Sequence, residues 1–464
     1  MSNWYDNAVF YQFYPMGITG APKENSWDWN NSWNGSLPPV NRLEKTIKEG
    51  GWIDHLKRLG VNAVYFSPVF QSDRHGYDTR DYYTIDSRLG SNDDFARLCT
   101  LLHDNGIRVV LDGVFNHVGR GFWAFRDVQQ NRENSAYKDW FYIDWNKNSN
   151  DNDGFWYEGW EGHFDLVKLN LENPAVIDHL FGAVKKWNDL FHIDGIRLDV
   201  AYSLSDEFLK KLHTFVNSLS NDCVLIGEII YEKDMHRVND SELYSCTNYE
   251  CYKALWSGCN DKNMFEVSHS FNRFFGNEGL FVGKNLMNFI DNHDVSRIAS
   301  QLTNRSFLPI IYGLLFGMPG VPCIYYGSEW GIEGKKEDGD DGLRPKLQNP
   351  AWTSITDFVA QLAYLHHQKV VLQQGGYQQL FLTNEQFMFK RTSQNCASSH
   401  DILVCINLSQ SNYTAHPKGR SSDGGYESFD GLYGNYKNLF TGEISNYTGE
   451  LYMPPLSVLY FEQV

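Results

Sequence analysis

Residues 92–117 read NDDFARLCTLLHDNGIRVVLDGVFNH, an amphipathic helix pattern followed by a short apolar strand with a polar end. The helix pattern covers residues 92–103, and the strand is Arg108-Val109-Val110-Leu111. A strand without polar alternation is typical of a parallel sheet that is covered by helices on its faces. The stretch therefore predicts one helix–strand unit of an α/β fold.

The same unit recurs along most of the chain. Helix patterns at residues 51–59, 174–191 and 206–219 each precede another short apolar strand. The predicted strands are residues 9–14, 63–66, 108–111, 195–198, 224–227, a weaker one near 247–249, 285–290 and 323–326. Eight such strands favour a closed (β/α)8 TIM barrel, with an open doubly wound sheet as the alternative. No GxGxxG follows a strand, so nothing supports dinucleotide binding.

Two segments depart from the alternation of strand and helix. Residues 118–169 hold a run rich in Asn and Asp and several aromatic residues, which predicts a small inserted domain. Residues 375–464 change to period-2 runs with turn residues, which predicts a C-terminal antiparallel β-sandwich domain. The barrel is then expected at residues 1–117 and 170–374.

Composition excludes several classes of protein. The chain has 464 residues, 42% of them hydrophobic and 21% charged, which is typical of a globular protein. Its 57 acidic residues exceed its 40 basic residues, so nucleic acid and anionic membranes are improbable partners. The uncharged run 307–327 contains three prolines and four glycines, and we expect a buried helix, turn and strand there instead of a membrane span.

Cysteine usage and the N-terminal residues indicate the compartment. Eight cysteines are scattered without a CxxC pair, so we expect free thiols. The N-terminus shows neither a basic segment nor an apolar one typical of a secretion signal. Together these features predict a cytoplasmic protein.

Polar residues gather just after four of the predicted strands. The third strand ends in residues 112–117, the fourth carries Arg197 and ends in Asp199, the fifth ends in Glu228, and the seventh ends in residues 291–294. In a barrel these ends converge on one pocket. Carboxylates grouped with histidine and arginine suit glycoside hydrolysis, in which positive charge develops on the sugar. Hydrolysis by two metal ions is the competing interpretation, although the chain lacks an HxH pair there.

Specific motifs narrow this chemistry. In order along the chain stand GYDTRDYYTID (residues 76–86), DGVFNH (112–117), GIRLD (195–199), GE (227–228) and FIDNHD (289–294). These segments resemble the ordered signatures of the α-amylase family, glycoside hydrolase family 13, and the likeness extends over nearly the whole chain. Residues 166–170, LVKLN, resemble the MPKLN motif of the cyclomaltodextrinase, neopullulanase and maltogenic amylase group.

The resemblance implies roles for three carboxylates. Asp199 would be the nucleophile, Glu228 the general acid/base, and Asp294 the residue that holds sugar hydroxyls in the distorted ring. Arg197 would keep Asp199 ionised, whereas Glu228 would need a raised pKa.

The resemblance also implies residues that bind substrate. His117 and His293 would contact the sugar at the cleaved position, and Tyr77 would stack beneath it. Asp78 would hold a nearby His or Arg. Tyr202 would bind the leaving-side sugar, since Ala201-Tyr202 stands where many family members have Lys-His. Arg344 with Asp340 resembles the family's DPxxR pair on the non-reducing side, although Asp341 replaces the proline.

No cofactor is expected to be required, and a structural calcium ion is the one metal considered. Asn116 aligns with a calcium ligand in many family members, but it could equally be a structural hydrogen-bond partner of His117. Residues 144–155 alternate like an EF-hand loop but lack its glycine and its final acid, so a solvated loop is favoured.

The resemblance thus implies a retaining α-glucan hydrolase that cleaves α-1,4 bonds of maltooligosaccharides, dextrins or cyclodextrins. A transglycosylase, in which a sugar accepts the glycosyl unit, would use the same residues and remains an alternative. A non-catalytic sugar-binding relative is the alternative from another class.

Overall fold

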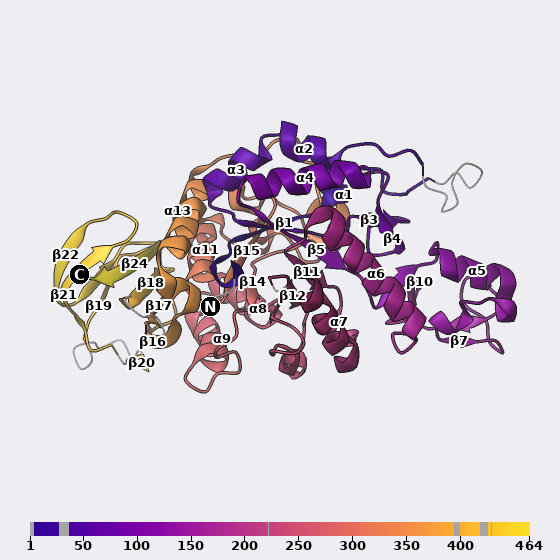
Figure 1. Ribbon diagram of the computed structural model, residues 1–464. Helices are drawn as coiled ribbons and strands as arrows, with labels where there is room; N and C mark the ends of the chain where they lie inside the picture. The colour runs from indigo at the N-terminus through magenta and orange to yellow at the C-terminus, as the bar shows by residue number, and fades with distance from the viewer. Residues whose placement is uncertain (1–3, 27–36, 221, 394–399, 418–425, 428) are drawn as a thin grey trace.

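A parallel sheet of eight strands forms the centre of the molecule, here a computed structural model that describes residues 4–26, 37–220, 222–393, 400–417, 426–427 and 429–464 (Figure 1). The strand order is β13-β12-β11-β5-β2-β1-β15-β14. The strands are β1 (Phe10–Phe13), β2 (Ala63–Phe66), β5 (Arg108–Gly113), β11 (Gly195–Leu198), β12 (Val224–Gly227), β13 (Ser245–Cys246), β14 (Met287–Asn288) and β15 (Val321–Tyr325). A parallel bridge between Thr247 and Met287 joins the two edges, so the sheet closes into the predicted (β/α)8 barrel.

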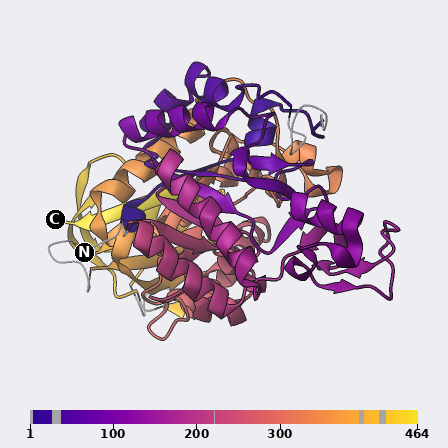
Figure 2. The ribbon, with the colours of Figure 1, turned by 45° about the vertical axis from the view of Figure 1, so that its right-hand side comes forward.

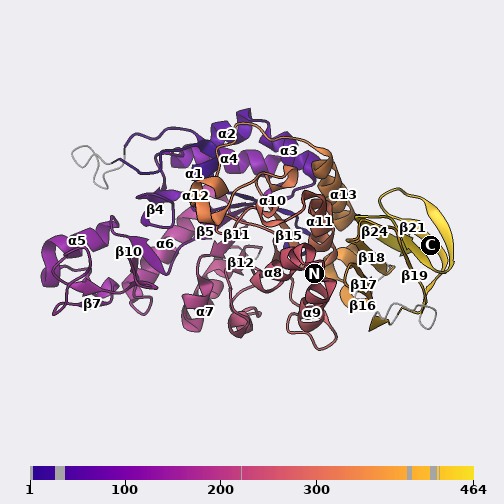
Figure 3. The same cartoon turned by 180° about the vertical axis from the view of Figure 1, so that it is seen from behind.

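Helices surround the barrel on its outside (Figures 1 and 3). The longer ones are α3 (Trp52–Leu59), α4 (Asn92–Asp104), α6 (Pro174–Phe191), α7 (Asp206–Leu219), α8 (Tyr249–Asn260), α9 (Met264–Phe275), α11 (Leu308–Gly317) and α13 (Ser354–Gln368). Shorter helices are α1 (Pro15–Thr19), α2 (Leu43–Glu49), α5 (Trp123–Asn131), α10 (Ile298–Gln301), α12 (Asp340–Leu343) and α14 (Val370–Gln374).

Alternation along the strands decides which side chains face the barrel axis. Phe10, Val110 and Ile226 belong to a separate apolar cluster inside the barrel, whereas their neighbours pack outward against the helices. Since successive strand side chains point to opposite faces, the residues two positions further on also face the interior. Those residues include Gln12, Asp112 and Glu228, which lie toward the carboxyl end of the barrel.

A small substructure follows the third barrel strand and projects beside the barrel (Figures 1 and 2). It contains α5 and the strands β6 (His117–Gly119), β7 (Ile143–Asp144), β8 (Trp156–Tyr157), β9 (Gly159–Trp160) and β10 (His163–Lys168). β6, β10 and β9 form one sheet, and β7 pairs with β8. Before α4, β3 (Phe70–Ser72) and β4 (Thr79–Ile85) form a further two-stranded sheet.

The C-terminal strands form an antiparallel domain, as predicted. One sheet has the order β20-β16-β17-β18-β24-β21-β22, and β19 pairs with β23. The strands are β16 (Gly376–Leu382), β17 (Gln386–Thr392), β18 (Ile402–Asn407), β19 (Tyr413–Ala415), β20 (Tyr426–Glu427), β21 (Leu432–Asn438), β22 (Ile444–Gly449), β23 (Leu451–Met453) and β24 (Ser457–Gln463). The domain packs on α11, where the Tyr460 hydroxyl donates to the Gly313 carbonyl at 2.7 Å.

The sixth strand requires a correction. The sequence placed it near residues 247–249, but β13 ends at Cys246 and Tyr249 is the first residue of α8. The cause is a helix cap, because the Asn248 side chain accepts a hydrogen bond from the Cys251 amide and ends the extended chain there.

Two other expectations concern the apolar run and the cysteines. The run 307–327 forms α11, a turn and β15, as predicted. None of the helices in the part of the chain that the structure describes is long and apolar enough to span a bilayer. The seven described cysteines are free, and Cys396 lies outside the described residues.

Candidate active site

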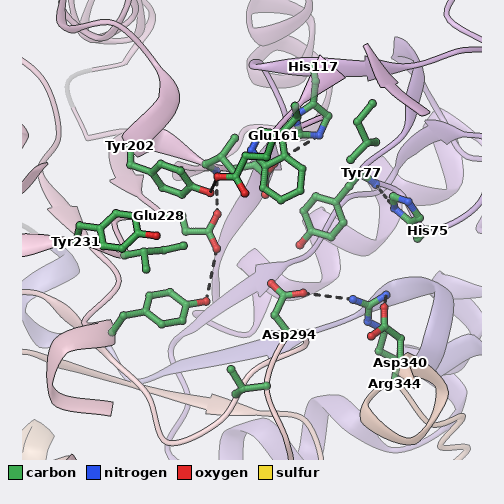
Figure 4. Close-up of a pocket in the computed structure, with 17 residues that line it drawn as sticks. His75, Tyr77, His117, Glu161, Tyr202, Glu228, Tyr231, Asp294, Asp340 and Arg344 are labelled. Carbon is green, nitrogen blue, oxygen red and sulfur yellow. Dashed lines mark hydrogen bonds and ion pairs between the residues drawn. The ribbon is translucent and has the colours of Figure 1, made fainter. Parts of the chain in front are cut away.

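A cavity of about 430 Å³ opens at the carboxyl end of the barrel, between the barrel loops and the small substructure (Figure 4). Asp199, Glu228 and Asp294 all border it, although they come from three different strand ends. The predicted residues Tyr77, His117, Tyr202, Asp340 and Arg344 border it too. The convergence expected from the barrel therefore occurs.

Arg197 connects the carboxylates at the base of the cavity. Its Nη1 lies 2.9 Å from Asp199 Oδ1 and 2.9 Å from both oxygens of Asp112, and its Nη2 lies 2.9 Å from Glu228 Oε1. Arg197 is only 3% exposed and lies behind the cavity wall. One guanidinium thus orients three buried carboxyl groups.

Asp199 keeps one oxygen available. Its Oδ1 is bonded to Arg197, whereas its Oδ2 has no hydrogen-bond partner among the described residues and lies 3.8 Å from His117 Nε2. Asp199 also borders the cavity, and a carboxylate held by one oxygen with the other free of hydrogen bonds is suited to attack a bound electrophile.

The pKa of Asp199 differs from expectation. Burial and the neighbouring Glu228 raise the pKa of Asp199 well above its ordinary value, against the opposing charge of Arg197. The sequence predicted that Arg197 would hold this pKa low, but Arg197 also serves Asp112 and Glu228. A single positive charge cannot offset three buried carboxylates.

Glu228 has the environment of a protonated acid. Burial raises its pKa, Arg197 opposes this, and Asp294 adds to the rise. The Val200 amide donates to Glu228 Oε2 at 2.8 Å. Val200 has φ of 41°, a strained conformation for a β-branched residue, and this backbone turn directs its N–H at Glu228.

Asp294 stays ionised on the opposite side of the cavity. Burial disfavours its charge, but the contact with His293 and the charge of Arg344 outweigh burial and hold the pKa of Asp294 below its ordinary value. His293 Nε2 lies 3.0 Å from Asp294 Oδ2, and Arg344 Nη2 lies 3.3 Å from Asp294 Oδ1. Arg344 also pairs with Asp340 at 3.0 Å, which is the predicted pair.

Tyr77 and His293 form a stacked pair. Their ring centroids are 5.3 Å apart with planes inclined by 7°, and the Tyr77 hydroxyl contacts both Asp112 Oδ2 and His293 Nε2. Asp78 lies behind this wall. It accepts the amides of His75 and Gly76 and pairs with Arg74, so it shapes the loop that carries Tyr77.

Asn116 supports His117 through a direct contact. Its side-chain nitrogen lies 3.2 Å from His117 Nδ1. In the described ranges, no three His, Cys, Asp or Glu side chains gather as a metal cluster. The donor set around Asn116 therefore fits the structural interpretation better than a carboxylate-rich calcium site. In residues 144–148, the Asp144 side chain likewise has partners within the protein. It accepts a hydrogen bond from the Asn146 amide and pairs with Lys147.

The cavity wall around Tyr202 contains residues that the sequence did not single out. Trp160 at the end of β9, Glu161 in the turn that follows, and Tyr231 border the cavity beside Tyr202. Tyr202 donates to Glu161 Oε1 at 3.3 Å and packs edge-on against Tyr231 at 6.0 Å (Figure 4). Aromatic residues near 155–164 were visible in the sequence, but nothing there told which of them would face the cavity.

Comparison with known proteins identifies the family. The catalytic-domain profile of α-amylase matches residues 51–368, which include Asp199, Glu228 and Asp294. The chain belongs to the α-amylase family. The predicted resemblance and fold are thereby confirmed.

Two of the similar relatives bear the names cyclomaltodextrinase and maltogenic amylase. A cyclomaltodextrinase of a Bacillus species is 33% identical over 352 residues, which span 72% of this chain and 61% of the relative. An intracellular maltogenic amylase of Bacillus subtilis is 31% identical over 340 residues, spanning 72% and 57%. The chain thus matches about three-fifths of the length of these relatives.

A solved structure matches the whole chain. The cyclic α-maltosyl-(1→6)-maltose hydrolase of Arthrobacter globiformis, without ligand, superposes with a TM-score of 0.79 at 25% identity. The match covers 100% of both chains.

Proposed function

We propose that this member of the α-amylase family is a retaining α-glucan hydrolase that cleaves α-1,4 bonds of maltooligosaccharides, dextrins or cyclodextrins. The observation that carries the proposal is the arrangement of Asp199 and Glu228 on one guanidinium at the border of the cavity, with one Asp199 oxygen free of hydrogen bonds to the described residues. The names of the relatives, cyclomaltodextrinase and maltogenic amylase, support this class of substrate.

In the proposed first step, Asp199 Oδ2 attacks the anomeric carbon while Glu228 protonates the leaving oxygen. A covalent glycosyl-enzyme and the shortened leaving sugar result. In the second step, Glu228 takes a proton from water, and the water oxygen displaces Asp199 to release the product. Asp294 and Arg344 hold the sugar on the other side, and the negative charges around the ring stabilise the oxocarbenium-like transition state. These steps need no metal ion or cofactor.

Transfer to a sugar is the second candidate function. Tyr202 and Tyr231 form an aromatic wall beside Glu228, and such rings stack well on sugar faces. An acceptor sugar bound there would compete with water for the glycosyl unit. Products longer than the substrate at high maltotriose would show this activity.

A substrate panel tests the proposal. We expect the protein to release reducing sugar from maltotriose, β-cyclodextrin or starch but not from sucrose, and Asp199→Asn should abolish the activity. Glu228→Gln should lose about 10²–10⁴-fold in kcat on maltotriose. It should still form a glycosyl-enzyme from a maltosyl fluoride, because fluoride leaves without a proton. No hydrolysis of any glucan by the full chain would refute the proposal.

The cytoplasmic location is also proposed here. It is supported by the name of the Bacillus subtilis relative, intracellular maltogenic amylase. Fractionation of cells that express the full chain would test it, and recovery outside the cytoplasm would contradict it.

A further inference from the structure

Gln12 makes a buried contact with His293 that the proposed mechanism does not use. Its side-chain nitrogen lies 2.8 Å from His293 Nδ1 and 3.1 Å from Ser67 Oγ. Gln12 is 3% exposed and His293 is 2% exposed. Gln12 comes from β1 and His293 follows β14, and these two strands lie on either side of β15 in the sheet.

The other ring nitrogen of His293 faces the cavity wall. His293 Nε2 lies 3.0 Å from Asp294 Oδ2 and is hydrogen-bonded to the Tyr77 hydroxyl. Tyr77 gives its own proton to Asp112 Oδ2 at 3.1 Å, and an ionised Asp294 can only accept. Neither the Tyr77 oxygen nor Asp294 Oδ2 can therefore donate to His293 Nε2, and Nε2 itself carries the hydrogen.

The remaining nitrogen must then accept. Burial lowers the pKa of His293 to about 3, although Asp294 opposes this shift. A neutral imidazole carries one hydrogen, which leaves Nδ1 as an acceptor. The amide NH2 of Gln12 is the donor that Nδ1 requires, and the opposite orientation of this amide would set two acceptors against each other.

We propose that Gln12 is a positioning residue that fixes the single hydrogen of the neutral His293 ring on Nε2. The inference rests on the proposed function, because only a reaction that develops positive charge makes this state important. A hydrogen on Nδ1 would face the Gln12 NH2, so forming the imidazolium would require the Gln12 amide to turn over. A neutral ring leaves the charge of Asp294 uncancelled and keeps an N–H aimed at the bound sugar.

Other charged and titratable groups also act on this ring. Tyr14 stacks on it at 6.0 Å, and Arg344 Nε donates to the His293 carbonyl at 3.1 Å. The groups that face or influence His293 are Tyr14, Tyr77, Arg197, Asp294, Lys336 and Arg344. Three of these groups, Arg197, Lys336 and Arg344, are cations that oppose binding of a second proton to the His293 ring. Gln12 therefore acts together with the electric field of these cations.

Nitrogen NMR of the unaltered full chain, labelled with ¹⁵N-histidine, tests the inference first. The His293 signal is the one lost in His293→Gln. We expect a neutral ring with its hydrogen on Nε2 at every pH from about 5 to 8. A hydrogen on Nδ1, or a transition to imidazolium in this range, would overturn the inference.

Two variants of matched length test the consequence for catalysis. Gln12→Glu places an acceptor at Nδ1, so His293 should become imidazolium at pH 7 and kcat on maltotriose should fall about 10–100-fold with little change in KM. Gln12→Met fills the same space without charge, so the ring should stay neutral and kcat should fall less. A neutral ring and parental kcat in Gln12→Glu would contradict the proposal. The spectra need no substrate, so an inactive parent would refute the proposed function and leave the inference on Gln12 standing.

Discussion

Single residues set the charge balance of the cavity. Arg197 is the only cation in contact with Asp112, Asp199 and Glu228 among the described residues, and all four side chains are almost fully buried. Arg197 shares its positive charge among three carboxyl groups and cannot fully offset the burial of each. Burial therefore raises the pKa values of both Asp199 and Glu228. The cluster therefore retains protons at pH values where isolated carboxyl groups would have lost them.

The pH dependence of activity should show this directly. We expect a bell-shaped kcat/KM profile on maltotriose whose two limbs belong to the coupled carboxyl group. The acidic limb should lie above the ordinary Asp value, because Asp199 must be ionised and its pKa is raised. Asp294 adds to the pKa of both Asp199 and Glu228, so Asp294→Asn should shift both limbs to lower pH while activity falls. Limbs that stay in place or move to higher pH would contradict this charge balance.

The same raised pKa has a consequence for stability. The native state keeps a proton on Asp199 at pH values where the unfolded chain, with a pKa of about 3.9, has lost it. Stability therefore falls as pH rises from about 4 toward the native-state pKa. Asn has no such proton, and Arg197 keeps Asp112 and Glu228 as partners. The Tm of Asp199→Asn minus that of the parent should become more positive from pH 4 to pH 7.

A matched control removes a carboxylate that is exposed to solvent. Asp178 is exposed on α6, and Asp178→Asn reports the general effect of one lost negative charge. Calorimetry of the three proteins provides the comparison. A Tm difference for Asp199→Asn that shrinks with rising pH, or that equals the control, would refute the explanation.

Individual elements show why much of the fold could be predicted. The bounds of β2, β11, β12, α6 and α7 agree with the sequence prediction. Local signals define them: Asn173 caps α6 with Pro174 at its first position, and Ser205 caps α7. The sixth strand was misplaced because a cap, Asn248, lies inside an apparently extended run.

Asn248 should be more important than an ordinary cap. It accepts the Cys251 amide and also donates to Asn288 Oδ1 at 2.8 Å, close to the one bridge that joins the two edges of the sheet. We expect Asn248→Ala to lower the free energy of unfolding by about 2–3 kcal/mol. Ser205→Ala removes a cap alone and should cost about 1 kcal/mol. Urea unfolding measures both, and equal losses would contradict the role of Asn248 in barrel closure.

At the scale of the whole molecule, long-range contacts limited prediction from sequence. The carboxylates were found because each follows its own apolar strand, a signal that is local. Gln12, Trp160 and Glu161 were missed because their positions depend on the order of the strands in the sheet and on how β9 and its following turn sit in the small substructure. No local sequence pattern indicates either of these arrangements.

The barrel and the C-terminal domain should unfold together. Buried Arg391 of β17 donates to the carbonyls of Gly317, Met318 and Leu372 on the barrel side and to those of Gly375 and Gly376. Arg391→Leu leaves these carbonyls without a donor and should cost about 3 kcal/mol or more. We expect one calorimetric transition in the parent and one, at lower temperature, in Arg391→Leu.

A neighbouring residue provides the control. Lys390 pairs with Asp401 at 3.0 Å on a partly exposed face, so Lys390→Leu should change stability by no more than about 1 kcal/mol. An unchanged Tm in Arg391→Leu, or two transitions in the parent, would show that the domains are not coupled in this way.

The central claim is a double displacement through Asp199, and the configuration of the first product tests it most directly. Two successive inversions at the anomeric carbon restore the original configuration, whereas direct attack by water inverts it once. Proton NMR of freshly formed product from α-linked maltotriose, recorded before mutarotation, distinguishes the two. The account predicts that the α-anomer appears first. Initial appearance of the β-anomer would contradict the retaining mechanism and the nucleophilic role of Asp199.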